Sequence, residues 1–120
     1  MELPSDSKLL RIFIGEIDKI GHQPLYELIL FEARKQSLAG CTVIRGIMSF
    51  GASSKVHTAR LIDISEDLPI VVEIVDTEDK INAFVSTVDS LMEKAACGGL
   101  VTVEKAGVLY YKHGPKKRIL

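Results

Sequence analysis

The stretch Pro69–Gly99, PIVVEIVDTEDKINAFVSTVDSLMEKAACGG, decides the fold of this chain. Its first eight residues are nearly all apolar, which predicts a strand that is buried on both faces for much of its length. Apolar residues then recur at positions i, i+3, i+4 and i+7, which predicts an amphipathic helix with Thr77 as its N-cap. Gly98 and Gly99 mark the end of this helix. A strand and a helix of this kind, followed by another strand, form one half of a repeated β-α-β pattern.

The segments outside this stretch supply the rest of the pattern. Upstream we expect a central strand over Lys8–Glu16, a helix over Pro24–Leu38 that ends by Gly40, and a second strand over Cys41–Phe50. Gly46 interrupts that second strand, which suggests a bulge or a close approach of two backbones. Downstream we expect a last strand over Leu100–Lys112, bent at Ala106–Gly107.

The predicted order is therefore β-α-β-β-α-β. Two right-handed crossovers in this order give a ferredoxin-like fold of the α+β class, with a four-stranded antiparallel sheet and both helices on one face. We expect one domain over residues 1–120, with flexible tails at 1–7 and 113–120. The strands are apolar on both sides, so the sheet face without helices needs a cover. Copies of the same chain are the simplest candidate, and we predict a homo-oligomer.

The composition limits the class of protein. The chain has 120 residues and a formal net charge of −1, which argues against a nucleic-acid-binding protein. No run of apolar residues is long enough to span a bilayer, and the start, MELPSDSK, has no apolar signal core. We therefore expect a cytoplasmic protein, in which Cys41 and Cys97 are reduced thiols.

The connection from Arg45 to Pro69 is long for a domain of this size, and long connections are usually functional or disordered. We expect its two ends to belong to the rigid sheet. The part between them, Ala52–Asp67, is predicted to be mobile and to report ligand binding to a partner protein.

Four segments resemble the domain of unknown function 190 family, whose members are similar to the PII signal-transduction proteins. They are IxxGxxDKxxxxPLYE from Ile12, TVIRGIMSFG from Thr42, HTARLIDISEDLPIVVEIVD from His57, and GGLVTVE from Gly98. The resemblance covers about Leu9 to Lys112. It implies a homotrimer of ferredoxin-like subunits, a long loop between the second and third strands, adenine nucleotides bound in clefts between subunits, and signalling to partner proteins.

The resemblance also implies which residues bind the ligand. Phe50–Gly51 matches part of the PII loop base, with Gly46 and Ser49 beside it, and a His-Thr pair follows at His57. Gly98–Gly99 matches the PII phosphate loop, and Lys112 is the basic residue kept on the last strand. Together with Arg45, the expected ligand-binding residues are Arg45, Gly46, Ser49, Phe50, Gly51, His57, Gly98, Gly99 and Lys112.

Two basic positions of PII proteins are absent here. Leu100 and Val101 follow the glycines where PII proteins have a lysine, and Pro69 leads directly into Ile70 where they have another basic residue. Fewer cations favour a nucleotide of the AMP or ADP type, or another small anion, over a triphosphate. The tyrosine that is modified in some PII loops also has no equivalent.

Several of the expected ligand-binding residues have a simpler structural explanation. Gly98–Gly99 could be a helix C-cap and turn rather than a phosphate cradle. Arg45 could lie on a solvated edge or pair with a carboxylate such as Glu73, rather than with an anionic ligand. Lys112 could be a solvated strand end, and the connection around His57 an ordinary surface loop.

Enzymatic function has little support, because the sequence contains no recognisable catalytic motif and no identifiable acid/base pair. We expect a binding protein with no catalytic residues. The His and Cys residues share no metal-ligand spacing, so we expect no metal site. Two alternatives stay open: a trimeric metal-handling protein similar to the cation-tolerance proteins, and an accessory subunit of a membrane ion channel or transporter, which family resemblance alone implies.

Overall fold

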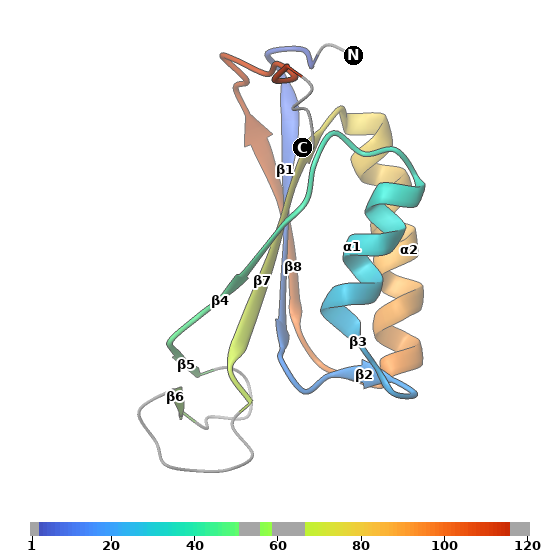
Figure 1. Cartoon of the computed structure of the whole chain (residues 1–120), viewed down its shortest axis with the longest axis vertical. Coiled ribbons are helices and arrows are strands. Elements are labelled where there is room, and N and C mark those ends of the chain that lie inside the picture. The colour runs from blue at the N-terminus through green and yellow to red at the C-terminus, as the bar shows by residue number, and fades with distance from the viewer. Residues whose placement is uncertain (1–2, 51–55, 59–66, 116–120) are drawn as a thin grey trace, which may run out of the picture.

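The computed structural model describes residues 3–50, 56–58 and 67–115. Two long helices lie on one side of a twisted sheet, and a small hairpin extends from one end of that sheet (Figure 1). The elements are, in order, β1 (Ser7–Gly15), β2 (Lys19–Ile20), β3 (Gln23–Pro24), α1 (Leu25–Lys35), β4 (Thr42–Arg45), β5 (Met48–Phe50), β6 (Val56–Thr58), β7 (Pro69–Asp76), α2 (Glu78–Ala95) and β8 (Leu100–Ala106).

The main sheet has four antiparallel strands in the order β4-β7-β1-β8. The strand β1 is central, as predicted, and pairs with β7 and β8 on its two sides. The predicted ferredoxin-like α+β fold is therefore confirmed. The order leaves β4 and β8 at opposite edges of the sheet.

The core lies between the sheet and the two helices. Every second residue of β1 and β7 points into it, including Leu10, Ile12 and Val72, none of which is exposed. From the helices, Ile29 and Phe84 are equally buried. The predicted N-cap of α2 is confirmed, since the Thr77 hydroxyl accepts a hydrogen bond from the backbone N–H of Lys80 at 3.4 Å.

The other face of the sheet, which we call the open face, carries neither of the two helices of the described residues (Figure 1). It is formed by the residues of β1 and β7 that alternate with the core residues, and by their neighbours on β4 and β8. The members are Leu9, Arg11, Phe13, Thr42, Ile44, Val71, Glu73, Val75, Leu100, Thr102 and Glu104. Most of these side chains are apolar and half-buried or exposed, as the prediction of an uncovered face requires.

The predicted strand Cys41–Phe50 is wrong as a single element. It divides at Gly46–Ile47, so that β4 stays in the main sheet while β5 pairs with β6 in a separate two-stranded sheet. The backbone of β5 therefore finds a partner in Val56–Thr58, which the sequence pattern placed in a mobile loop. Residues 52–55 and 59–66 of that predicted loop lie outside the described residues, whereas its last residue, Asp67, is described.

Two other boundaries and one connection also differ from the predictions. The last strand ends at Ala106, so Gly107–Lys112 is not part of it. The helix α1 ends at Lys35, and Ser37 rather than Gly40 takes up the left-handed conformation, with φ of 59°. The connection between β1 and α1 contains the short β2–β3 hairpin, which the sequence pattern did not predict.

Candidate functional site

Most of the predicted site residues lie at one end of the main sheet, which we call the arm end. At this end β1 finishes at Gly15, β4 finishes at Arg45, β7 begins at Pro69 and β8 begins at Leu100. The β5–β6 hairpin, which we call the arm, projects from it (Figure 1).

Arg45 is the predicted site cation that lies beside the arm. Its guanidinium donates a hydrogen bond to the carboxylate of Glu16, so it forms an ion pair that links the ends of β4 and β1. The Arg45 side chain remains 60% exposed. The sequence suggested a carboxylate partner such as Glu73, which in fact pairs with Arg11. Glu16 already neutralises part of the positive charge of Arg45, so Arg45 would attract an anionic ligand less strongly.

Gly46 lies between the end of β4 and the start of the arm. Its backbone N–H donates to the carbonyl of Pro69 at 2.7 Å, and a Cβ atom at this position would lie 2.7 Å from Cγ of Pro69. The close backbone approach predicted for Gly46 is therefore confirmed. The reason for glycine here is packing against the first residue of β7, with no ligand needed to explain it.

The arm carries exposed apolar side chains. Phe50 is 74% exposed, and Ile47 and Met48 are 78% and 54% exposed. Ser49 is half-buried and lies opposite His57 in the β5–β6 pairing, which places the backbone of His57, another predicted site residue, beside β5. Gly51 lies outside the described residues. An exposed aromatic ring next to apolar neighbours can stack on a planar, apolar ligand surface.

Gly98 and Gly99 have different surroundings. A Cβ atom on Gly99 would lie 2.6 Å from the carbonyl oxygen of Phe13 and 2.7 Å from Cε of Met92, so glycine is required for packing. At Gly98 no atom lies within 4 Å of such a Cβ, and the residue is exposed. The left-handed C-cap of α2 is Ala96, with φ of 52°, so neither glycine is the cap. Of the two, Gly98 is the one whose backbone an anion could approach.

Acidic groups organise the loop that leaves β1. The Asp18 carboxylate accepts a hydrogen bond from the Gly15 N–H at 2.8 Å, and the Asp67 carboxylate accepts one from the Ile17 N–H at 3.1 Å. Burial raises the pKa of the Cys97 thiol, and the negative charge of the nearby Asp18 raises it further. These carboxylates hold the loop in place and add negative charge to the arm end.

Lys112 does not lie at the arm end. Along β1, Phe13 is opposite Leu100 and Ser7 is opposite Ala106, so β8 runs six residue steps from one end of the sheet to the other. At about 3.4 Å per residue this is about 20 Å, and Lys112 follows the far end of the strand. The structure therefore separates Lys112 from Gly98, and the two cannot hold one small ligand within a single chain.

A charged group at the centre of the open face was not predicted from the sequence. The Arg11 guanidinium donates from Nε to Glu73 at 2.9 Å and from Nη1 to Glu104. The hydrogen bond to Glu73, with the charge of Glu104 adding to it, raises the pKa of Arg11 above its ordinary value. The available signal was a lone arginine between Leu9 and Phe13 on one face of an apolar strand.

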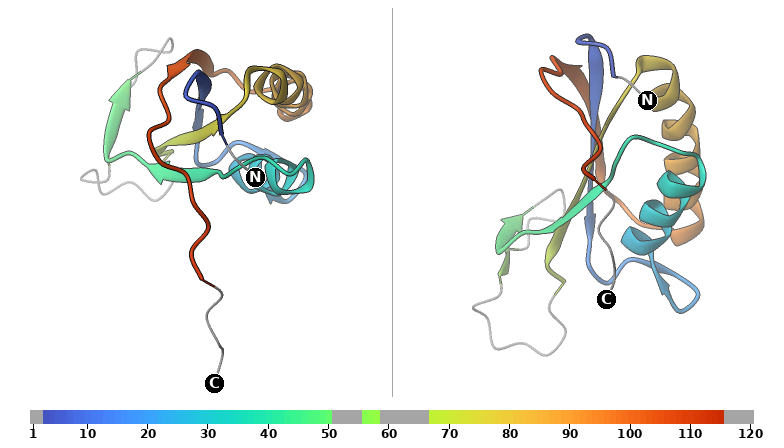
Figure 2. Two further views of the ribbon diagram at one scale, coloured as in Figure 1. Left: turned by 90° about the horizontal axis from the view of Figure 1, so that it is seen from above. Right: turned by 45° about the horizontal axis from the view of Figure 1, so that its top comes forward.

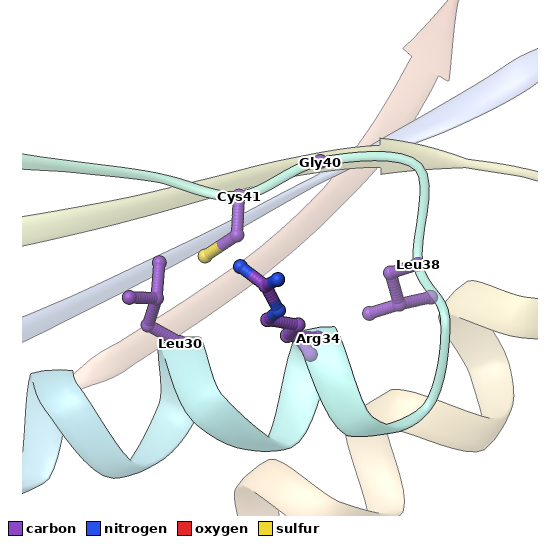
Figure 3. Close-up of a pocket in the computed structure, with 6 residues that line it drawn as sticks. Leu30, Arg34, Leu38, Gly40 and Cys41 are labelled. Atoms are coloured by element: carbon purple, nitrogen blue, oxygen red, sulfur yellow. The ribbon is translucent and has the colours of Figure 1, made fainter. Parts of the chain in front are cut away.

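One surface hollow is lined by Leu30, Ala33, Arg34, Leu38, Gly40 and Cys41, with a volume of about 230 Å³. It lies between α1 and the residues that lead into β4, and the Arg34 guanidinium extends across it toward the backbone at Gly40–Cys41 (Figure 3). Burial raises the pKa of the Cys41 thiol to about 11, so this thiol is protonated at neutral pH and is a weak nucleophile. The hollow adjoins no predicted site residue.

Within residues 3–50, 56–58 and 67–115, no group of three or more His, Cys, Asp or Glu side chains is arranged to hold a metal ion. Neither helix of the described chain is long and apolar enough to cross a membrane.

The family model of DUF190, described as an uncharacterised ACR family, matches residues 7–108. A UPF0166 protein of Aquifex aeolicus is 36% identical over 103 residues, which cover 86% of this chain and 93% of the relative. A UPF0166 protein of Methanocaldococcus jannaschii is 32% identical over 76 residues, which cover 63% of this chain and 69% of the relative.

Solved structures of PII-like proteins share the fold. CPII of Thiomonas intermedia, a nitrogen regulatory PII-like protein bound to ADP, AMP and bicarbonate, superposes with a TM-score of 0.62 at 17% identity, covering 85% of this chain and 89% of CPII. A putative PII-like signalling protein of Thermus thermophilus superposes with a TM-score of 0.63 at 18% identity, covering 90% of this chain and 93% of that protein. At these identities the similarity establishes a common fold.

Proposed function

We propose that this chain, which belongs to the DUF190 family, is a PII-like regulatory protein that binds a small anionic ligand, an adenine nucleotide of the AMP or ADP type, in clefts between the copies of a homotrimer. The proposal is for a binding protein and not for an enzyme. The bound adenine nucleotides of CPII suggest the ligand class, and the arrangement of the arm end supports the position of the site.

The main supporting observation is that the candidate groups lie at the same end of the sheet but at opposite edges. Arg45 and the arm continue from β4, while Gly98 precedes β8. Two strands lie between these edges, so at about 4.8 Å per strand the groups are about 14 Å apart within one chain. A closed ring in which the β4 edge of each copy meets the β8 edge of the next would bring them together.

In such a cleft, the two sides would have different roles. The exposed Phe50 of one copy would stack on the base, and the open backbone at Gly98 of the next would bind a phosphate. Arg45 would contribute only part of its charge, because it also binds Glu16. A site with so little cationic charge favours a monophosphate or diphosphate over a triphosphate.

The proposed signal passes through residues 52–67. Within this segment, Val56–Thr58 and Asp67 are described, and the backbone of Val56 pairs with that of Phe50. A ligand on Phe50 would therefore lie beside one end of Val56–Thr58. For binding to change the segment, the ligand must prefer one of its conformations, since equal affinity for both would shift nothing. The partner that reads the change would be another protein, with a membrane transporter or channel as one candidate.

Isothermal titration calorimetry with AMP, ADP, ATP and cyclic AMP tests the ligand. We expect AMP or ADP to bind more tightly than ATP. Phe50→Ala should weaken binding about tenfold, as expected for the loss of an aromatic contact. Phe31→Ala is the matched control, because Phe31 is 50% exposed on α1 and lies away from the arm. The absence of heat with all four nucleotides would refute the nucleotide proposal.

Sedimentation velocity tests the homotrimer. The expected mass is about 40 kDa, three times the 13.2 kDa of one chain. A monomer at micromolar concentration would contradict the proposal, since the two sides of the cleft would then never meet. Co-purification from membranes, with and without AMP or ADP, tests whether the partner is a membrane protein.

A further inference from the structure

The segment that follows β8 has a sequence suited to a strand but forms none. Val108–Lys112 reads VLYYK, which is rich in β-branched and aromatic residues, yet the strand ends at Ala106. Leu109 is 98% exposed and Tyr110 is 78% exposed. Two large apolar side chains in succession, both in solvent, indicate a surface that contacts something outside this chain.

The segment is nevertheless held in place. The Val108 N–H donates to the Ser5 carbonyl at 3.3 Å, and the Tyr111 hydroxyl donates to the Ala39 carbonyl at 2.9 Å. It therefore runs from the β8 edge to the residues that lead into β4, at the opposite edge. Figure 2 shows the segment, in red, crossing the green trace before β4 on the side away from the helices and continuing past that edge.

The open face offers a complementary surface. Its apolar residues include Leu9, Phe13 and Val75, which lie around the cluster of Arg11, Glu73 and Glu104. That cluster has two carboxylates for one guanidinium, so its charges leave an excess of negative charge. The Glu104 side chain is 57% exposed. A segment with two apolar side chains followed by a lysine matches this surface in both polarity and charge.

We propose that, in the homotrimer, Val108–Lys112 of each copy lies on the open face of the next copy. Leu109 and Tyr110 cover apolar side chains there, and Lys112 pairs with Glu104. The inference rests on the proposed homotrimer, and it assigns Lys112 to contact between copies instead of to ligand binding.

The geometry favours a neighbouring copy over the chain's own open face. Tyr111 is fixed at Ala39, on the β4 side, whereas Glu104 of the same chain lies on β8 at the other edge. Consider a ring that places β4 of one copy beside the β8 edge of the next. The segment then passes the β4 edge of the first copy close to Glu104, on β8 of the second. Ala39, which holds Tyr111, and Glu104 also lie at nearly the same position along the strand direction of the sheet. Ala39 donates its N–H to Asp76, the partner of Lys8 on β1, and Glu104 is the partner of the next residue, Leu9.

The first experiment changes the apolar side chains. The Leu109→Ser/Tyr110→Ser variant should raise the concentration at which the trimer dissociates at least tenfold, measured by sedimentation velocity over a dilution series. Phe31→Ser is the matched control for the loss of an exposed apolar group and should not change it. An unchanged dissociation in the Leu109→Ser/Tyr110→Ser variant overturns this inference and leaves the homotrimer standing. A monomeric wild type refutes the homotrimer and the inference with it.

The second experiment changes the charges. Lys112→Glu and Glu104→Lys should each weaken the trimer, and the double variant should restore it toward the wild type. Mixing the two single variants should restore it in part, because some contacts in a mixed ring are then complementary. Rescue by the double variant without rescue on mixing would place the contact within one chain and overturn the inference. If neither the double variant nor the mixture restored the trimer, Lys112 and Glu104 would not be paired, and that part of the inference would be overturned.

Discussion

The two faces of the main sheet are built from the same strands but are covered differently. In β7, Ile70, Val72 and Ile74 are at most 3% exposed beneath the helices, whereas Val71 and Val75 between them are only half-buried. Their residue types are nearly interchangeable. The difference is therefore one of cover: this chain supplies helices for one face and, on our proposal, leaves the other to copies of itself.

The comparison can be tested most strongly with two adjacent valines. Val72→Asp would bury an unpaired charge in the core, which costs about 4 kcal/mol or more and should leave little folded protein. Val71→Asp should leave the chain folded and reduce its tendency to associate. Circular dichroism with urea denaturation and sedimentation velocity measure the two effects. If both variants unfolded to the same extent, the open face would be as essential to the single chain as the covered face.

A smaller effect is expected where α2 meets the end of β1. Gly99→Ala would force a methyl group against Phe13 and Met92, and we expect a loss of about 1–3 kcal/mol in the free energy of unfolding. Gly98→Ala is the control, since nothing lies within 4 Å of its added Cβ, and its effect should stay within about 0.5 kcal/mol. Equal losses in thermal or urea denaturation would show that the close packing at Gly99 is not what requires a glycine.

A still smaller change is expected for the ion pairs of the open face. The Arg11 side chain is 36% exposed, so solvent screens its ion pairs and Arg11→Gln should lower the stability of a single folded chain only slightly. Arg45→Gln, which removes another exposed ion pair at the arm end, should have a similarly small effect. Arg11→Gln should also weaken association, because Arg11 lies on the open face. At protein concentrations at which copies associate, the denaturation midpoint of Arg11→Gln should be lower than that of the wild type at the same concentration. A wild-type midpoint that does not depend on protein concentration would argue that copies do not cover this face.

The smallest expected effect concerns the rate at which the Cys41 thiol, just before the edge strand β4, is alkylated. Burial favours the neutral thiol of Cys41 and raises its pKa to about 11, so at pH 8 only about one molecule in a thousand carries the thiolate there. Alkylation of Cys41 by iodoacetamide should be slow at pH 8 and accelerate about tenfold per pH unit up to about pH 11. Mass spectrometry of digested protein separates it from Cys97. Alkylation of Cys41 at the rate of an ordinary exposed thiol would show that the hollow before β4 does not shield it.

Much of the fold was predictable because its signals are local. The helical spacing of α2, its Thr77 cap and the apolar run of β7 need no knowledge of the rest of the chain. The division of Cys41–Phe50 was not predictable, since it depends on a distant partner, Val56–Thr58, that competes for the backbone of β5. The same holds for Arg45, whose partner Glu16 is 29 residues away and lies just beyond the end of β1.

The candidate site was predictable only in part. Arg45, Gly46, Ser49, Phe50 and Gly98–Gly99 do share one end of the sheet, and the predicted ferredoxin-like order already places β4 and β8 at opposite edges. The close approach at Gly46 was also predicted, but the sequence could not show that packing explains Gly99. Lys112 was placed on the last strand because that strand was expected to continue, whereas the strand stops at Ala106.

Among the described residues, the outer edges of β4 and β8 pair with no further strand, and this has a consequence for the newly made chain. Edge strands present backbone groups that can pair with any other strand, so a single copy of this chain would be exposed to disordered aggregation. Closure into a ring would saturate both edges at a fixed number of copies, whereas a slightly different angle between copies would give an open-ended filament. The outcome during synthesis would then depend on the local concentration of the chain, and production at low levels or at high dilution should favour trapped single chains over finished assemblies.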